Sequence, residues 1–269
     1  MRRIAVPGAA GKMGRMVIEA IGERGAEASL SAALERPGHA GLGTPHAHGA
    51  TVALSDDIGA ALRDSDAYVD FTAPAASVAL AKAAAAQAAA GGKRVAAIIG
   101  TTGCSAADRG AFELAATHVP MVFAPNFSLG VNLLVGLVEQ AARALGEDFD
   151  LEVVELHHKL KRDAPSGTAI AIGEAMARGR HTTLEATRCY AREGDVGPRP
   201  AGEIGVMAVR GGDVVGEHTA FFFGAGERLE LTHRATSRAI FARGAVRAAL
   251  WAAGKPPGMY SMRDVLGLS

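Results

Sequence analysis

Short apolar runs alternate with longer segments of helical periodicity through residues 1–125, and this alternation most constrains the fold. The runs lie at residues 4–6, 29–34, 67–71, 95–99 and 121–123. Between the first two, apolar residues follow the i, i+3, i+4 spacing of an amphipathic helix. A segment rich in alanine, the strongest helix former, follows the third run. Strands and helices in this order predict right-handed β-α-β units, and therefore a Rossmann-type doubly wound parallel sheet in an α/β domain.

The stretch "PGAAGKMGR" directly follows the first apolar run and carries glycines at positions 8, 11 and 14. A dinucleotide pyrophosphate binds at such a helix N-terminus because free N–H groups and the helix dipole favour negative charge. Gly8 permits a tight turn, Gly11 lets the main chain approach phosphate, and Gly14 lets the helix lie close to the sheet. The usual dinucleotide-binding spacing is G-x-G-x-x-G, and Ala10 occupies the position of its second glycine. The glycines alone therefore leave a plain β-α loop open as the alternative.

Glu35 strengthens the cofactor interpretation because it ends the second apolar run, 21 positions after Gly14. An acidic side chain there accepts hydrogen bonds from the adenosine ribose, while the adjacent Arg36 can pair with a 2′-phosphate, so NAD(H) and NADP(H) both remain open. Extended short-chain dehydrogenases share the glycine spacing but use Tyr-x-x-x-Lys. None of the three tyrosines, at positions 68, 190 and 260, has a lysine four residues later.

The pattern changes after Asn126. Periodicity predicts a helix over residues 131–145, "DLEVVEL" predicts a strand at 150–156, and a further helix is expected at 167–178. Residues 205–233 have β character, and "HTAFFFGAGERLELTH" within them is typical of two strands joined by a turn. These elements predict an α+β domain with a mainly antiparallel sheet.

A final helix is expected over residues 237–253, with Ser237 as its N-cap and Pro256-Pro257 preventing extension. We therefore predict a dinucleotide-binding domain over residues 1–127, with residues 237–269 packing back on it. Residues 128–236 are predicted to form a substrate-binding and oligomerisation domain.

Five of the six residues 157–162, "HHKLKR", can carry positive charge, and "DAPSGTA" follows them. Pro165 and Ser166 favour a helix start, so Gly167 and Thr168 would present N–H groups to a carboxylate. Histidine and lysine are suitable proton donors near neutral pH. The loop therefore indicates a site for an acidic small molecule, and the competing interpretation is a solvated cationic loop.

Other uses of these residues are less favoured. The basic cluster has no interleaved aromatic residues and lies in a chain with 28 Lys plus Arg against 28 Asp plus Glu, which disfavours nucleic acid. Neighbouring histidines point apart and no metal-ligand spacing completes a site, so we expect no metal. A second histidine cluster, His39, His46 and His48, lies in a glycine-rich stretch that is more typical of a loop than of a metal site.

Composition limits the class of protein further. Apolar residues make up 49% of the chain, yet no run approaches the length of a membrane span. The sequence passes from Met1 into a strand-like segment without a signal-peptide pattern, and two cysteines are too few for a disulfide scaffold. We therefore expect a cytoplasmic protein that binds neither membranes nor nucleic acid.

These motifs together resemble the 4-hydroxy-tetrahydrodipicolinate reductase (dihydrodipicolinate reductase) family of the diaminopimelate and lysine pathway. The resemblance covers essentially the whole chain and is carried by "GAAGKMGR", "DFTAP", "GTTG", "APNFSLGVN", "ELHHKLKRDAPSGTA" and "VGEHT". It implies NADH or NADPH as cofactor, a small dicarboxylate as substrate and a homotetramer built through the second domain. Lys159 and Leu160 occupy positions at which the residue type varies within the family, and the resemblance implies no role for either.

The resemblance also implies roles for individual residues. His157 corresponds to the general acid/base and Lys161 to the proton donor. Substrate carboxylates would be contacted by His158, Gly167 and Thr168. The implied cofactor residues are Gly8, Gly11, Lys12, Met13, Glu35, Arg36, Gly100, Thr101, Thr102, Ala124, Pro125, Asn126 and Phe127. The reaction would remove the 4-hydroxyl as water and reduce the resulting imine by hydride and proton transfer.

Two rival functions remain open from the residues alone. A semialdehyde dehydrogenase needs a nucleophilic cysteine, and Cys104 is the candidate in the first domain, although the sequence shows no activating base beside it. A non-catalytic dinucleotide sensor would keep the glycine turn and Glu35 but would have no use for the loop at 157–168.

Overall fold

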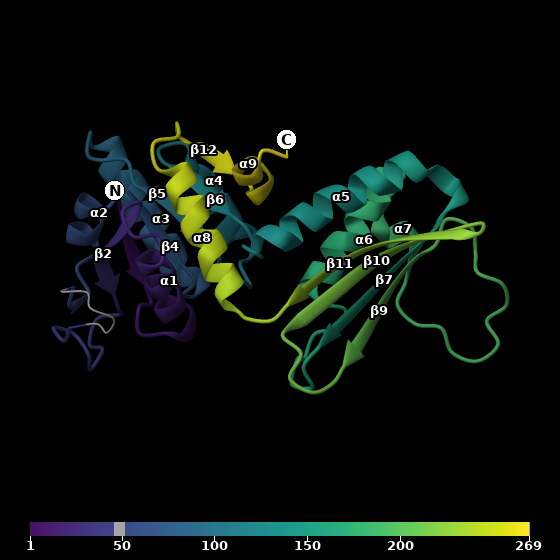
Figure 1. Ribbon diagram of the computed structural model, residues 1–269. Coiled ribbons are helices and arrows are strands. Elements are labelled where there is room, and N and C mark those ends of the chain that lie inside the picture. Colours follow the sequence, from purple (N-terminus) through teal and green to yellow (C-terminus); the bar gives the residue numbers. More distant parts are fainter. Residues whose placement is uncertain (46–51, 269) are drawn as a thin grey trace. The chain divides into compact units, whose positions relative to one another are not determined.

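The structure is a computed structural model that describes residues 1–45 and 52–268 of the chain. His46 and His48 of the second histidine cluster lie outside the described residues, while His39 accepts a hydrogen bond from the Gly41 N–H at 3.1 Å. The chain divides into two compact units, residues 1–129 with 239–269 and residues 130–238 (Figure 1). In the part of the chain that the structure describes, no helix has the length and apolar character to cross a membrane.

A seven-stranded sheet forms the centre of the first unit. The strand order is β12-β6-β5-β4-β1-β2-β3 and every pairing is parallel, which confirms the predicted doubly wound sheet. The strands are β1 (Arg2–Pro7), β2 (Ala28–Leu34), β3 (Leu54–Ser55), β4 (Ala67–Asp70), β5 (Ala96–Ile99), β6 (Pro120–Phe123) and β12 (Gly258–Tyr260). Because β3 and β12 are so short, neither stood out as an apolar run.

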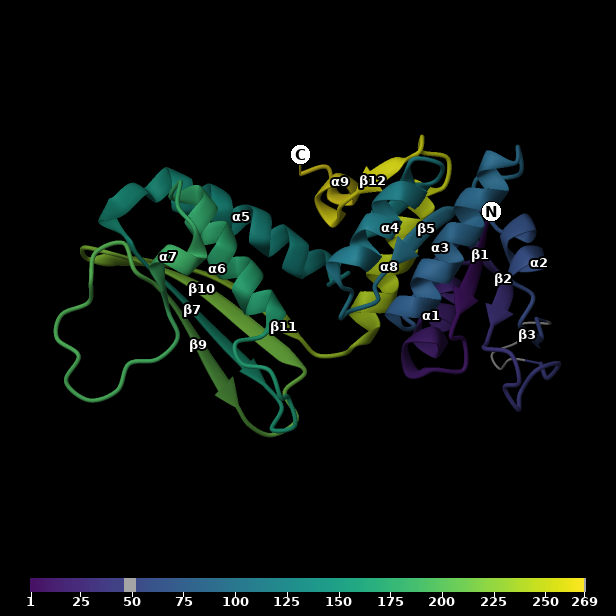
Figure 2. The same ribbon diagram turned by 180° about the vertical axis from the view of Figure 1, so that it is seen from behind.

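Helices cover both faces of this sheet (Figures 1 and 2). On one face, α1 (Lys12–Gly22) and α8 (Ala239–Ala252) bury their apolar residues with those of α9 (Met262–Leu266). The other face is covered by α2 (Ile58–Asp64), α3 (Pro74–Ala89) and α4 (Ala106–Ala116). Helix α8 begins two residues after the predicted cap Ser237, a displacement within the usual uncertainty of helix ends.

The second unit contains a five-stranded sheet in the order β11-β10-β7-β9-β8. Strands β7, β10 and β11 pair antiparallel as predicted, whereas β9 pairs parallel with both β7 and β8. The strands are β7 (Asp150–His157), β8 (Arg188–Cys189), β9 (Ile204–Arg210), β10 (Gly216–Gly224) and β11 (Glu227–Ala235). The helices are α5 (Leu129–Leu145), the 3-10 turn η1 (Gly146–Asp148), α6 (Gly167–Gly179) and α7 (Leu184–Thr187). Apolar residues of α5 and α6 pack on one face of this sheet.

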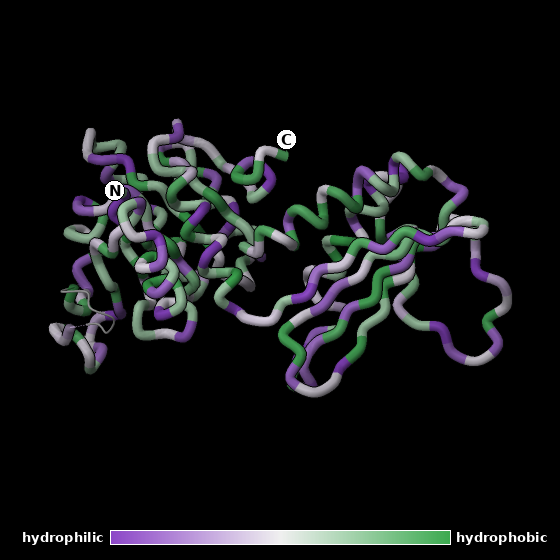
Figure 3. Tube along the Cα trace, viewed as in Figure 1, coloured by the Kyte–Doolittle hydropathy of each residue, from purple (hydrophilic) through white to green (hydrophobic). Residues whose placement is uncertain are grey.

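Strand β7 alternates between buried and partly exposed residues, and hydrophobic and hydrophilic segments follow one another along this sheet (Figure 3). Leu151 and Val153 point into the core beneath α5 and α6. The same buried set continues with Glu155 and His157. Because alternate residues of a strand point to the same face, the side chains of Glu155 and His157 are buried on the face that α5 and α6 cover, at the carboxyl end of β7.

Helix α8 lies so close to the chain at Phe127 that Gly244 has no room for a side chain. An added Cβ would lie 2.9 Å from the Phe127 carbonyl carbon and closer still to its oxygen. We expect Gly244→Ala to lower the free energy of unfolding by about 1–3 kcal/mol, as overpacking does. Urea denaturation measures this change.

Gly110→Ala is the matched control, because Gly110 is also in a helix but an added Cβ would have no atom within 4 Å. Better helix propensity should raise its stability by about 0.5–1 kcal/mol. Equal effects of the two substitutions would contradict the close approach of α8 at Phe127.

Candidate active site

The glycine turn connects β1 to α1 by a tight backbone path. Gly8 has a φ of +65°, a conformation that L side chains rarely adopt, and its carbonyl accepts from the Gly11 N–H at 2.9 Å. At Gly14 an added Cβ would lie 2.8 Å from the Ala9 Cα, so only glycine lets α1 approach the turn this closely. Gly11 is the N-cap of α1, and the first turn of the helix carries no acidic residue. The turn therefore has the backbone geometry and the positive helix end that a pyrophosphate requires.

Glu35 lies against this turn from the end of β2. Its carboxylate accepts from the Ala10 N–H at 3.0 Å and from the Arg36 N–H at 3.3 Å. Lys12 and Arg36 are exposed. The structure therefore brings the predicted pyrophosphate and ribose residues together at the carboxyl edge of the sheet.

A cavity of about 290 Å³ opens in the first unit beside α1. Seven predicted cofactor residues line it, whereas Ala124 is buried behind the lining. The lining residues are Met13, Phe71, Thr72, Gly100, Thr101, Thr102, Pro125, Asn126, Phe127 and Phe241. Sequence reasoning missed Phe71, Thr72 and Phe241. Phe71 ends a predicted strand and Thr72 follows it within "DFTAP", whereas Phe241 comes from a helix far along the chain and carried no spacing signal.

Hydrogen bonds beneath the cavity fix the threonines that line it. Asp70 accepts from the Thr72 backbone N–H at 2.8 Å and from its hydroxyl at 2.6 Å. The Ser77 and Thr101 hydroxyls lie 2.7 Å apart in the same buried layer. The Phe71 ring packs edge-on against Phe127, with ring centroids 5.8 Å apart. These contacts fix the side chains that form the largely apolar lining of the cavity.

In the second unit, the predicted basic loop leaves the end of β7. His157 is buried, whereas His158 and Lys161 are half-buried and Lys159 is exposed. The Lys161 ammonium lies 2.9 Å from the carboxylate of Asp163. The loop is therefore not a uniformly solvated charge run, because its first histidine belongs to the interior.

His157 belongs to a buried polar cluster built on Glu155, which is 0% exposed. The Glu155 carboxylate accepts from His157 Nδ1, from both terminal nitrogens of Arg210 at 2.9 Å, and from the Ser166 backbone N–H at 2.9 Å. His218 Nε2 lies 3.2 Å from the Ser166 hydroxyl, and the His218 ring packs edge-on against His157. Glu155 could have been found two positions before His157 on one strand face, but Arg210 and His218 lie on other strands.

The cluster shifts the pKa values of its members. Burial lowers the pKa of His157, and the attraction of Glu155 does not restore it. Burial lowers the pKa of His218 to about 4, with His157 adding repulsion. Burial alone would raise the pKa of Glu155, but the hydrogen bonds from Arg210, His157 and the Ser166 N–H outweigh it and lower the value. Near neutral pH, both imidazoles are therefore neutral beside an ionised carboxylate.

Ser166 also begins α6, since its hydroxyl accepts from the Ala169 N–H at 3.2 Å. Gly167 and Thr168, the predicted carboxylate contacts, form the first turn after this cap. The Glu155 cluster thus lies directly beneath a helix N-terminus, the kind of end that favours an anion.

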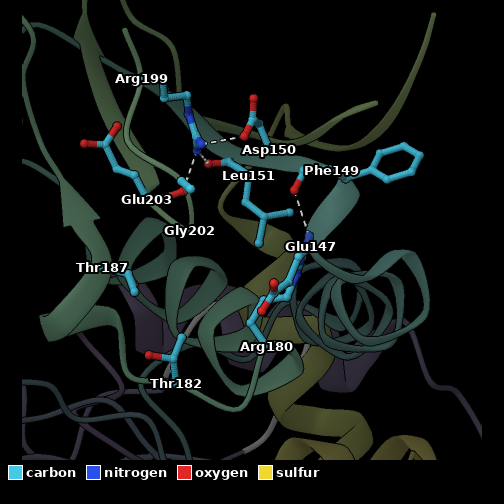
Figure 4. Close-up of a pocket in the computed structure, with 11 residues that line it drawn as sticks. Glu147, Phe149, Asp150, Leu151, Arg180, Thr182, Thr187, Arg199, Gly202 and Glu203 are labelled. Carbon is cyan, nitrogen blue, oxygen red and sulfur yellow. Dashed lines mark hydrogen bonds and ion pairs between the residues drawn. The ribbon is translucent and has the colours of Figure 1, made fainter. Parts of the chain in front are cut away.

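The second unit also has a cavity of about 410 Å³, which lies between the start of β7, the end of α6 and residues 199–203 (Figure 4). Arg199 donates to Asp150 at 2.7 Å and to the Leu151 carbonyl at 3.0 Å, and Arg180 donates to the Phe149 carbonyl at 2.8 Å. Three carboxylates line it, those of Glu147, Asp150 and Glu203. Arg180 and Arg199 line it as well, and none of the predicted catalytic or substrate-binding residues does.

Within residues 1–45 and 52–268, no three His, Cys, Asp or Glu side chains are grouped so that they could hold a metal ion.

Comparison with known proteins gives matches over the whole chain. The family described as "Dihydrodipicolinate reductase, N-terminus" matches residues 2–127, and "Dihydrodipicolinate reductase, C-terminus" matches residues 130–266. A 4-hydroxy-tetrahydrodipicolinate reductase of Anaeromyxobacter sp. (strain Fw109-5) is 50% identical, over 100% of this chain and 98% of the relative. The enzyme of the same name from Alkalilimnicola ehrlichii is 49% identical, over 99% of each chain.

Among solved structures, a dipicolinate-bound dihydrodipicolinate reductase from Paenisporosarcina sp. TG-14 has the same fold. Its TM-score is 0.77 at 23% sequence identity, and 97% of each chain is covered.

The lowered pKa of His218 makes stability depend on pH. Its folded value of about 4 lies below the ordinary 6.5, so the unfolded chain binds a proton first and stability falls as pH drops through this window. We expect His218 to account for a loss of about 2 kcal/mol in the free energy of unfolding between pH 7 and pH 5. Urea denaturation of the wild type and of His218→Asn at both pH values isolates this contribution.

His118→Asn serves as the control because His118 is exposed. It should show the same pH dependence as the wild type, whereas His218→Asn should show a weaker one. Identical slopes for all three proteins would contradict a neutral, buried His218.

Proposed function

This chain belongs to the dihydrodipicolinate reductase family, and we propose that it reduces 4-hydroxy-tetrahydrodipicolinate to tetrahydrodipicolinate with NADH or NADPH and loss of water. The reaction is a step of diaminopimelate and lysine biosynthesis. The observation that carries the proposal is the end-to-end similarity, at about half identity, to curated 4-hydroxy-tetrahydrodipicolinate reductases. The solved relative was bound to dipicolinate, which is likewise a cyclic dicarboxylate.

The first unit suits the nicotinamide dinucleotide. A Cβ at Gly8 would lie 2.9 Å from the Thr72 side chain, so the turn after β1 keeps its path beside Thr72 only with glycine in place. Gly11, Lys12 and Met13 would complete the pyrophosphate contacts, with Glu35 and Arg36 at the adenosine ribose. The nicotinamide would be held by the cavity residues, namely Gly100, Thr101, Thr102, Pro125, Asn126 and Phe127, with Ala124 supporting them. When bound, the reduced nicotinamide supplies the hydride.

The second unit supplies orientation and protons. His158, Gly167 and Thr168 would hold the substrate carboxylates at the N-terminus of α6. Once the 4-hydroxyl has left as water, reduction of the conjugated imine requires one proton. We assign its delivery to Lys161, with His157 as the general acid/base.

Cys104 argues against the semialdehyde dehydrogenase alternative. Burial raises the pKa of its thiol, with the nearby Asp108 adding to the effect, and the thiol donates to the Thr101 carbonyl. A nucleophilic cysteine needs the opposite shift, because the thiolate is the reactive form.

Lys161→Ala tests the proposed chemistry. The wild type should oxidise NADH or NADPH when given freshly made product of the preceding synthase. We expect the substitution to lower kcat about 100-fold, the usual loss for a proton donor, while leaving cofactor affinity unchanged. Absorbance of the reduced nicotinamide gives the rate, and fluorescence titration gives the affinity.

Lys159→Ala is the control, since Lys159 is exposed in the same loop and is assigned no contact. It should keep the wild-type rate within about twofold. Flat absorbance with the wild type would overturn the function, whereas full rate in Lys161→Ala would overturn only the role of Lys161.

We further propose a cytoplasmic homotetramer built through the second unit. Helices α5 and α6 cover one face of its sheet, while the opposite face keeps apolar side chains at the surface. Val209 is 47% exposed and Phe223 37%, and Phe221 stacks on Phe223 with ring centroids 5.5 Å apart. Exposed apolar side chains on this sheet face fit the same face of further copies of the chain.

Val209→Glu should break this assembly, because it places a charge among the exposed apolar side chains of this sheet face. Light scattering coupled to size exclusion should give a tetramer for the wild type and smaller species for the variant. Leu114→Glu is the matched control, as Leu114 is 69% exposed on α4 of the first unit, and it should remain tetrameric. A monomeric wild type would overturn the assembly.

A further inference from the structure

We propose that Glu155, neutralised by Arg210, is a positioning residue that fixes both His157 and the N-terminus of α6. The inference rests on the proposed function for the meaning of these two sites. The anchoring itself is a property of the unliganded protein and can be measured without turnover.

The first step concerns how the Glu155 carboxylate is used. One oxygen accepts from the Ser166 N–H and from Arg210 Nη2, and the other accepts from Arg210 Nη1 and His157 Nδ1. A carboxylate has about four lone-pair sites, so these four donors saturate it. Glu155 is also fully buried. It therefore has no free site for substrate or water, and it acts through the groups that it holds.

The second step concerns the tautomer of His157. Since Nδ1 donates to Glu155, the neutral ring carries its proton there, and Nε2 is left as the atom that exchanges protons. Gly216 keeps the space beside Nε2 open, because a Cβ there would lie 2.9 Å from it. The hydrogen bond thus selects the tautomer and the ring orientation at once.

The third step links this imidazole to the carboxylate-binding end of α6. The Ser166 N–H bound by Glu155 belongs to the residue that caps α6. One side chain on β7 therefore sets the position of His157 and of the turn containing Gly167 and Thr168. Such a shared anchor keeps the proposed acid/base and the proposed carboxylate contacts in fixed register.

The fourth step is charge. An ionised carboxylate buried beside a dicarboxylate site would repel the substrate, and the paired contact with the Arg210 guanidinium cancels that charge. Arg210 also donates to the Asp163 carbonyl at 2.6 Å, which ties the basic loop to β9. Glu155 and Arg210 therefore act as one neutral unit.

The charged and titratable groups that face His157 come from four segments. Glu155 lies on β7, Arg210 on β9 and His218 on β10, while Lys161 lies in the loop that follows β7. Glu155 favours the imidazolium form, whereas Arg210 and Lys161 oppose it. Removing Glu155 and removing Arg210 must therefore move the titration of His157 in opposite directions.

The experiment is a ¹⁵N NMR titration of the histidine rings in the unliganded full chain. Glu155→Gln should lower the pKa of His157 and Arg210→Met should raise it, each by about one pH unit. Glu155→Gln should also mix the two ring tautomers. Glu152→Gln is the matched control, because Glu152 lies on the same strand and is also paired with arginines, Arg192 and Arg199, yet it does not contact His157.

Kinetics supply a second readout. In both variants the pH profile of kcat should shift in the same direction as the NMR titration. KM for the dicarboxylate should rise about tenfold in Glu155→Gln as the end of α6 loosens, whereas cofactor affinity should stay unchanged. Glu155→Asp, which keeps the charge but is shorter, should keep the pKa of His157 closer to the wild-type value than Glu155→Gln does.

Either variant tests the positioning role on its own if it folds, since each has its own expected direction of the pKa shift of His157. An unchanged His157 titration in Glu155→Gln or in Arg210→Met, or shifts of both in one direction, would overturn the positioning role. A wild type without reductase activity, combined with the expected opposite shifts, would overturn the proposed function and leave the anchoring intact.

Discussion

Both units depend on one physical constraint, the placement of a helix N-terminus beside the carboxyl end of a strand. In the first unit the helix can approach the strand end because Gly14 has no side chain, which lets α1 lie against the backbone of the turn after β1. In the second unit it is electrostatic, because Glu155 on β7 holds the N–H of the α6 cap. Each of these two helix ends presents backbone N–H groups and a positive dipole end, which favour negative charge.

The cost of burying charge explains how the second site is built. A buried carboxylate must be paired and fully hydrogen-bonded, or it takes up a proton. Arg210, His157 and Ser166 meet that demand for Glu155, and the structure gains three fixed groups in return. Lys161 does not bind Glu155; its ammonium lies 2.9 Å from the carboxylate of Asp163 in the loop that follows β7.

Much of this arrangement could be predicted from the sequence, because it depends on local patterns. Five of the seven parallel strands are apolar runs bounded by turn residues, and the glycines of the first turn follow directly from the chain. The strand β7 and the start of α6 were likewise visible. Phe241 and Arg210 were not, since each reaches its site from an element distant in sequence. Short strands such as β3 and β12 were missed because two or three residues give no period.

The cluster also separates the tasks of the two proposed proton-transfer groups. Burial and Arg210 lower the pKa of His157, so its ring is neutral near pH 7 and has an open Nε2. A neutral imidazole can accept a proton, but it has none to give from Nε2. In the proposed reaction Lys161 delivers the proton to the reduced substrate, and a neutral His157, held in one tautomer by Glu155, is the proposed proton acceptor.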